Sequence, residues 1–132
     1  MSYLLDTNAC IQALNNQNSF VAQRIIRIPT ECIYLCTIVC MELYYGAYKS
    51  RRTQENLNHL ADFFRQFSIL PFDQESSRIT GYIRTGLEVA GMPIGLYDLQ
   101  IAAIALSNDL ILITHNTREF SRVHNLKYED WE

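Results

Sequence analysis

The chain has 132 residues, of which 48% are hydrophobic and 19% are charged, a composition typical of one globular domain and not of a disordered chain. Its apolar stretches are far too short to cross a membrane, and its first residues lack the basic region of a signal peptide, so we expect a cytoplasmic protein. The net charge of −3 argues mildly against a nucleic-acid binder, but it leaves room for a local basic patch and for an acidic metal site.

Hydrophobic periodicity predicts that strands alternate with helices along the chain. The first half is expected to contain strands over residues 3–5 and 31–37, and helices over residues 9–14, 19–29, 38–48 and 53–67. Ser19 and Thr37 stand at two of these helix starts, where a hydroxyl can cap the helix. Residues 32–36 are a continuous apolar run, which is typical of a strand buried on both faces of a parallel sheet.

The second half continues the same alternation. We expect strands over residues 68–72 and 110–113, an edge strand near Tyr128, and helices over residues 74–90, 98–107 and 116–120. Asp73 and Gly91 suit the start and the end of the long helix, whose inward face would be Ile79, Tyr82, Ile83 and Leu87. The fold predicted for residues 1–132 is a single α/β domain, a three-layer α/β/α sandwich with a mostly parallel sheet of about five strands.

Four cysteines, Cys10, Cys32, Cys36 and Cys40, raise the question of a zinc site or of disulfides. Zinc sites pair such a cluster with a second pair of ligands, and the three histidines have no matching spacing. We therefore expect reduced, mostly buried thiols, with Cys32 and Cys36 in a strand and Cys40 on the next helix.

Acidic side chains follow the predicted strands or stand near a helix start: Asp6, Glu42, Asp98 and Glu119. In a parallel sheet these points lie along one edge, where ligands bind. Like charges about 4 Å apart repel by about 4 kcal/mol at an effective dielectric near 20, so such a cluster needs protons or a cation. Oxygen ligands suit Mg²⁺ or Mn²⁺, and carboxylate-held metal suits phosphodiester hydrolysis. Each acid alone can be a helix cap or a surface residue; their coincidence favours a site.

The segments that carry these acids are LDTN around Asp6, MEL around Glu42, GLYD ending at Asp98, and THNTREF from Thr114 to Phe120. In this order they resemble the PIN-domain family, and within it the VapC-type toxins of bacterial toxin–antitoxin pairs. The likeness covers essentially the whole chain. It implies a Mg²⁺-dependent endoribonuclease, in which Mn²⁺ can replace Mg²⁺, acting on structured RNA, with transfer RNA a frequent target. The implied partners are a cognate antitoxin and a second copy of the chain.

Carried over residue by residue, Asp6, Glu42 and Asp98 match the family's acidic triad and are expected to hold the metal. Thr114 matches a hydroxyl near the metal. The fourth acidic position is occupied by Asn116, so Glu119 is expected to supply the missing carboxylate, with Asn116 as a neutral ligand or as a hydrogen-bond donor that orients Glu119.

Basic residues that could guide the RNA backbone are Lys49, Arg51, Arg52, Arg84, Arg118 and Arg122. Solvated helix faces explain each of them equally well. His115 is a weaker candidate for a general base than metal-bound water. Unpaired bases could stack on Tyr44, Tyr45 and Tyr48, although core or interface packing is the commoner role. The aromatic segment 43–48 and the apolar helix ending at Phe67 also support the expected homodimer.

Other protein classes place acids at strand ends. A phosphatase of the haloacid-dehalogenase type needs a second aspartate two residues after the first, where this chain has Asn8. A response-regulator receiver domain needs a phospho-acceptor aspartate and a partner lysine that the pattern does not supply. The non-enzyme alternative is an interaction module that binds metal only structurally.

Overall fold

Five strands form one sheet in the computed structural model, which describes all 132 residues. They are β1 (Tyr3–Leu5), β2 (Ile33–Cys36), β3 (Ser68–Leu70), β4 (Ile111–Ile113) and β5 (Tyr128–Glu129). Their order is β3-β2-β1-β4-β5, and every neighbouring pair is parallel. The short strands are apolar because both faces of the sheet are covered.

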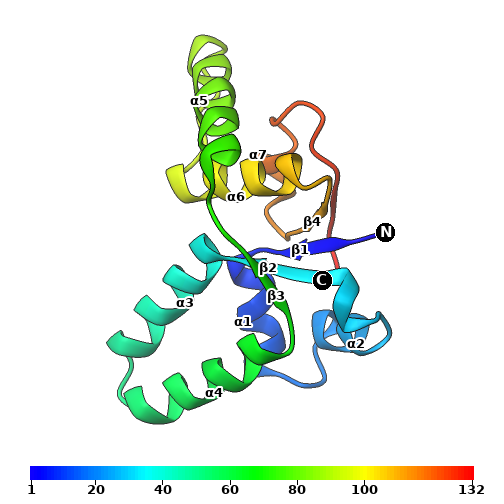
Figure 1. Ribbon diagram of the computed structural model, residues 1–132, viewed down its shortest axis with the longest axis vertical. Coiled ribbons are helices and arrows are strands. Elements are labelled where there is room, and N and C mark those ends of the chain that lie inside the picture. Colours follow the sequence, from blue (N-terminus) through cyan, green and yellow to red (C-terminus); the bar gives the residue numbers. More distant parts are fainter.

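Helices fill the connections between the strands. They are α1 (Thr7–Asn15), α2 (Phe20–Ile26), the 3-10 helix η1 (Thr30–Cys32), α3 (Thr37–Lys49), α4 (Thr53–Arg65), α5 (Gln74–Val89), α6 (Leu96–Ser107) and α7 (Thr117–Phe120). Figure 1 shows α1 to α4 on one side of the sheet and α5 to α7 on the other. The predicted three-layer α/β/α sandwich is confirmed.

The two-sided arrangement follows from the strand order. Connections from β1 to β2 and from β2 to β3 step one way across the sheet, whereas those from β3 to β4 and from β4 to β5 step the other way. Because such crossovers are right-handed, opposite steps place their helices on opposite faces. The chain after β1 therefore crosses one face of the sheet, and the chain after the neighbouring strand β4 crosses the other face. A crevice opens between them at the carboxyl ends of the two strands. This switch point is the expected place for a ligand.

Helix ends follow the predicted capping at most positions. Ser19 and Asp73 are N-caps, since Ser19 Oγ accepts from the Ala22 N–H at 3.1 Å and Asp73 Oδ1 from the Ser76 N–H at 2.9 Å. The prediction that Thr37 caps α3 is wrong. Cys36 precedes the helix directly, because β2 runs into it without a break, and the Thr37 hydroxyl instead accepts from the Phe72 N–H at 3.1 Å.

Gly91 ends α5 as predicted, with φ at +71°, a conformation that side chains disfavour. Its N–H donates to Glu88 O at 3.1 Å, and the Met92 N–H donates to Leu87 O at 2.9 Å. This pair of bonds is the Schellman arrangement. One inward position of α5 was predicted wrongly: Tyr82 is 77% exposed, because α6 covers only a narrow stripe of the helix.

The cysteines are free thiols, and Cys10, Cys36 and Cys40 are buried. Cys32 was expected in the second strand, but it lies in η1 and is only half-buried. Burial raises the pKa of the Cys36 and Cys40 thiols to about 11, so both are protonated and apolar in character at neutral pH. None of the helices is long and apolar enough to cross a membrane.

Apolar side chains of α4 and α3 differ in exposure. Leu60, Phe63 and Phe64 of α4, and Phe67 after it, are buried, which corrects the expectation that they form an external surface. The tyrosines of α3 at positions 44, 45 and 48 are exposed by 43%, 67% and 67%. Of these two helices, α3 is therefore the one that exposes large aromatic side chains.

Candidate active site

Asp6 lies in the switch-point crevice, directly after β1. Its Oδ1 accepts from the Ala9 N–H at 2.8 Å and so caps α1, and its own N–H donates to Ile113 O at 3.1 Å. The side chain of Thr114, directly after β4, lies beside this carboxylate and lowers its pKa. The residue is only 5% exposed. Two adjacent strands thus fix the position of this carboxylate.

Capping does not explain why Asp6 is buried. Asp73 caps α5 with the same geometry while exposed to solvent, and its hydrogen bonds to Ser76 lower its pKa. Burial raises the pKa of Asp6 instead, helped by the charges of Glu132 and Glu42 and opposed by the bonds from Thr114 and Ala9. An aspartate can thus cap a helix without the free-energy cost of burying its carboxylate. The buried position of Asp6 therefore points to a role besides capping.

Glu42 faces this crevice from the second turn of α3. Its Oε1 accepts from the Thr7 hydroxyl at 2.6 Å, which ties α3 to the start of α1. Apolar neighbours in the sequence cover Glu42 only in part, since Leu43 is buried but Met41 and Tyr45 are exposed. The residue that orients Glu42 is therefore Thr7, which the sequence reading did not assign.

Asp98 lies in the first turn of α6, whose N-cap is Gly95, so it does not open the helix as predicted. Burial, which is the largest cause, and the charges of Glu119, Asp6 and Glu42 together raise its pKa to about 6. The carboxylates of Glu119, Asp6 and Glu42 are therefore close enough to Asp98 to affect its pKa. The acid that follows β1 and the acids on α3, α6 and α7 thus lie in one neighbourhood, and their role as a metal site stays a prediction.

Glu119 is half-buried in α7, and its carboxylate lies close enough to Asp98 to raise the pKa of Asp98. Its Oε2 accepts from the Asn116 side-chain amide at 3.2 Å, so Asn116 has the orienting position that was one of its two expected roles. The Asn116 N–H in turn donates to Thr114 Oγ1 at 3.0 Å. One chain of contacts therefore links Asp6, Thr114, Asn116, Glu119 and Asp98.

The donor set of this site fits a hard divalent cation. It consists of carboxylate, hydroxyl and amide oxygens, which suit Mg²⁺ or Mn²⁺. Repulsion from neighbouring carboxylates helps to raise the pKa of Asp98, and a bound cation would offset the same repulsion. No three of these carboxylates bring oxygen atoms within 4.8 Å of one another. A cation would need to draw them together.

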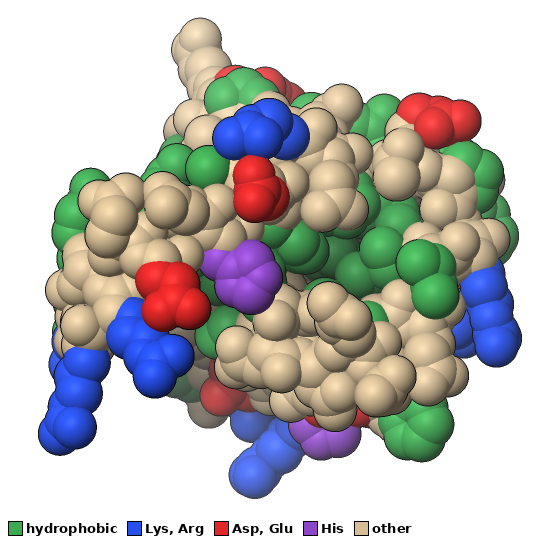
Figure 2. Space-filling view, turned by 90° about the horizontal axis from the view of Figure 1, so that it is seen from below, with side chains coloured by type: hydrophobic (Ala, Val, Ile, Leu, Met, Phe, Trp, Pro, Cys, Tyr) green, Lys and Arg blue, Asp and Glu red, His purple; other side chains and the backbone are tan.

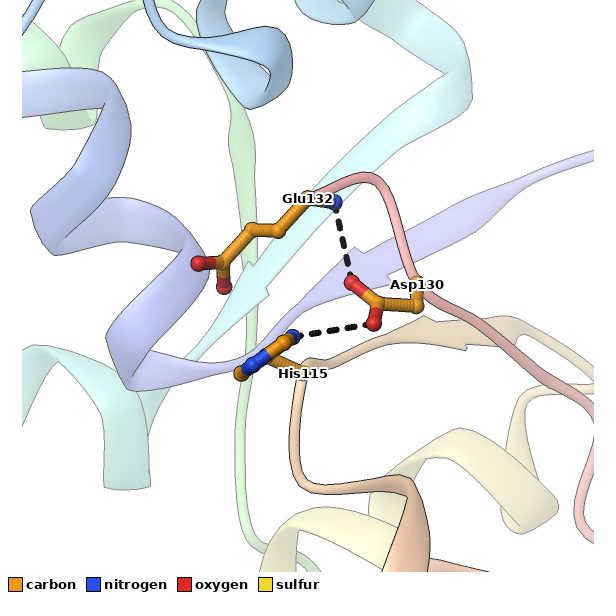
Figure 3. Close-up of side chains that lie close together, drawn as sticks. All are labelled: His115, Asp130 and Glu132. Atoms are coloured by element: carbon orange, nitrogen blue, oxygen red, sulfur yellow. Dashed lines mark hydrogen bonds and ion pairs between the residues drawn. The ribbon is translucent and has the colours of Figure 1, made fainter.

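A second cluster, shown in Figure 3, consists of His115, Asp130 and Glu132, whose candidate ligand atoms lie within 4.8 Å of one another. Asp130 Oδ2 is 2.9 Å from His115 Nδ1, and Asp130 Oδ1 accepts from the Glu132 N–H at 2.9 Å. All of them are exposed. Glu132 points toward the junction of β1 and α1 and raises the pKa of Asp6. Sequence reasoning considered His115 but gave no signal for the two tail acids.

Trp131 holds this tail against the body of the protein. Its ring lies edge-on to Tyr3, with centroids 5.2 Å apart, and the Arg24 guanidinium lies 4.9 Å from the indole centroid. Its Nε1–H donates to Glu129 Oε1 at 3.1 Å. The buried indole thus fixes where Asp130 and Glu132 lie.

The predicted RNA-guiding residues are dispersed. Lys49, Arg51 and Arg52 lie where α3 meets α4, Arg84 lies on α5, and Arg118 lies on α7 beside Glu119. Arg52, which precedes α4, pairs with Glu55 of that helix at 3.7 Å, and Arg84 pairs with Glu88 within α5 at 3.1 Å. Arg122 donates to Pro93 O at 3.0 Å. Their role in RNA binding stays a prediction.

Without a divalent cation, the protein is expected to become more stable as the pH falls through about 6, the raised pKa of Asp98. The folded chain binds this proton at a pH where the unfolded chain has lost it, so stability decreases as pH rises. Because Asp98 is only half-buried, we expect a difference of at most about 1 kcal/mol between roughly pH 5 and pH 7. Urea unfolding at both values measures it, and Asp98→Asn should reduce the difference. An unchanged difference in that variant would assign the effect to another group.

Comparisons with known proteins agree with this geometry. Residues 3–126 match the PIN domain family. The chain is 37% identical over 131 residues to the tRNA(fMet)-specific endonuclease VapC of Shigella flexneri, covering 99% of this chain and 98% of the relative. It is 35% identical over 133 residues to Ribonuclease VapC2 of Rickettsia felis, covering 100% and 99%. A crystal structure of DNA-bound VapBC from Salmonella typhimurium superposes with a TM-score of 0.94, at 36% identity and over 100% of this chain and 99% of that one.

Proposed function

The chain belongs to the PIN domain family, and from this premise we propose that it is a metal-dependent endoribonuclease, the toxin of a toxin–antitoxin pair. The observation that carries the proposal is the convergence of Asp6, Glu42, Asp98 and Glu119 at the switch point of the sheet. Relatives with over a third of their residues identical are named endonuclease or ribonuclease VapC, which supports the same activity. The nuclease domain would span residues 1–132.

Each residue has a distinct role in this proposal. Asp6, Asp98 and Glu42 would hold Mg²⁺, or Mn²⁺ in its place, and this cation supplies charge neutralisation and an acidified water for phosphodiester hydrolysis. Thr114 lies beside the carboxylate of Asp6, and the Thr7 hydroxyl holds the carboxylate of Glu42 by a hydrogen bond. Asn116 does the same for Glu119. Such orienting contacts reduce the reorganisation that the reaction needs.

We propose structured RNA, and transfer RNA in particular, as the substrate. The relative from Shigella flexneri is named for action on tRNA(fMet), and that name motivates the choice. The net charge of −3 means that RNA contacts must come from local cations, of which Arg118, beside Glu119, and Lys49 lie on the helices that carry the acids.

The proposed partners are an antitoxin and a second copy of the chain. Similar solved structures are VapBC complexes, from Salmonella typhimurium and from nontypeable Haemophilus influenzae, the second with a TM-score of 0.90 and 32% identity. A cavity of about 250 Å³ between α1, α3 and α4 is lined by Leu14, Leu43, Leu60 and Glu42. Figure 2 views this side of the molecule and shows a hollow with hydrophobic atoms at its floor. An antitoxin segment with an apolar face would fit here, beside Glu42.

Metal removal tests the proposed activity. The purified protein, incubated with labelled transfer RNA and Mg²⁺, should produce discrete fragments, and excess EDTA should abolish them until Mg²⁺ or Mn²⁺ is restored. Sequencing the new 5′ ends identifies the bond that is cleaved. Asp6→Asn protein prepared in parallel controls for contaminating ribonucleases. Cleavage that continues in EDTA would contradict the metal dependence, and intact RNA under all these conditions would contradict the nuclease.

A further inference from the structure

A separate pocket opens between α1, α3 and the start of α6. Its volume is about 540 Å³, and its apolar walls include Tyr45 and Met41 of α3 and Tyr97 of α6. We call it the tyrosine pocket. A planar nucleobase is far smaller than this volume and would enter without rearrangement of the walls.

The tyrosine pocket is continuous with the candidate active site. Thr7 and Glu42, whose side chains are joined by the 2.6 Å hydrogen bond, form part of its lining. Tyr97 also directly precedes Asp98 in the first turn of α6. A nucleobase bound in this pocket would therefore belong to a nucleotide next to the phosphate that is held at the carboxylates.

The structure distinguishes among the tyrosines of this region. Tyr45 and Tyr97 are 67% and 51% exposed and line the pocket. The Tyr44 ring instead packs edge-on against Phe64, with centroids 5.4 Å apart. Tyr48 is 67% exposed on the same helix but is not part of the lining. Only Tyr45 and Tyr97 offer free ring surface beside the acids.

Polar groups at the edge of the pocket could contact the hydrogen-bonding edge of a base and a neighbouring phosphate. Asn8 belongs to the lining, and its amide supplies both a donor and an acceptor for the edge of a base. The Lys49 ammonium lies 5.6 Å from the centroid of the Tyr45 ring, where it can contact a neighbouring phosphate. Aromatic walls, one amide and one cation are the chemistry by which proteins bind unstacked bases of RNA.

We propose that the tyrosine pocket binds one unpaired nucleobase of the RNA, adjacent to the cleaved phosphodiester, and so contributes to the choice of cleavage position. This inference rests on the proposed nuclease function. It requires the RNA to be single-stranded or unstacked at that base, which favours loops over continuous helices.

The test uses substitutions that remove the rings without touching the acids. Tyr45→Ala and Tyr97→Ala should each lower kcat/KM for a cleaved RNA by a factor on the order of ten to a hundred, the usual loss when one base no longer stacks. Tyr45→Phe and Tyr97→Phe keep the ring and should retain near wild-type values. Tyr48→Ala is the matched control on α3, with the same exposure as Tyr45 and no place in the pocket.

A second readout examines base choice. The cleaved RNA is prepared with each of the four bases on either side of the cut, and the wild-type preference should weaken at one position in the alanine variants only. Equal rates and preferences in wild type and in both alanine variants would overturn the base pocket and leave the nuclease intact. Loss of antitoxin binding or of dimers, with RNA kinetics unchanged, would also overturn it and assign the surface to a protein partner. A wild-type protein that neither binds nor cleaves RNA would overturn both proposals.

Discussion

Replacing Asp6 or Asp98 by Asn is expected to reduce RNA cleavage by more than about a hundredfold, beyond the range typical of residues that only support a metal ligand. Asn keeps the shape of Asp and the acceptor oxygen that caps α1, so the fold should remain. What the substitution removes is the negative charge. Without a cation, loss of that charge relieves repulsion among the acids, and the variants should be slightly more stable than wild type.

The measurement is the initial rate of transfer RNA cleavage at saturating Mg²⁺, with urea unfolding of the same samples. Asp73→Asn is the matched control, since it makes the same change at a helix cap outside the candidate site. It should cleave at the wild-type rate. Near wild-type cleavage by Asp6→Asn or by Asp98→Asn would show that the residue concerned does not hold the metal.

The fold was predictable from the sequence because its strands are short, uninterrupted apolar runs separated by helical periodicity. The continuous apolar runs at residues 110–113 and 32–36 are typical of strands buried on both faces, and they predicted a parallel sheet. Errors arose where tertiary contacts outweighed local preference. Cys32 belongs by composition to the apolar run, but the chain turns through η1 before the strand begins. Tyr82 lies in phase with the inward face of α5, yet the packed stripe is too narrow to include it.

Strand-end logic predicted which acids converge, because the carboxyl edge of a parallel sheet is set by topology alone. It did not predict the contacts that orient them. The bond from Thr7 to Glu42 joins residues from different helices, and no spacing rule connects them. Asp130 and Glu132 reach the neighbourhood of His115 because β5 pairs with β4, which places Glu129 beside Ile113. Trp131 also packs on Tyr3, a contact between opposite ends of the sequence.

Glu119 is expected to supply the fourth carboxylate, and Glu119→Gln should reduce cleavage by a factor on the order of ten to a hundred. Asn116→Ala should cause a smaller loss, since it removes only the amide that holds Glu119 Oε2 at 3.2 Å. Because the two side chains act through one contact, the double variant should be no worse than Glu119→Gln alone. Glu75→Gln is the matched control, a first-turn glutamate of α5 outside the site.

Titration of the cleavage rate with Mg²⁺ separates the two roles. With Asn in place of a fourth acid, we expect one cation to bind tightly and a second to arrive with the RNA phosphate, so Glu119→Gln should need more Mg²⁺ for half-maximal rate. Among the neighbouring charges, that of Glu119 raises the pKa of Asp98 most. Glu119→Gln removes this charge, so the pKa of Asp98 should fall from about 6 toward its ordinary range. The rise in stability on acidification should then shift to lower pH. Unchanged rate and Mg²⁺ dependence in Glu119→Gln, with a large loss in Asn116→Ala, would instead mean that the neutral residue contacts the metal and Glu119 is a surface acid.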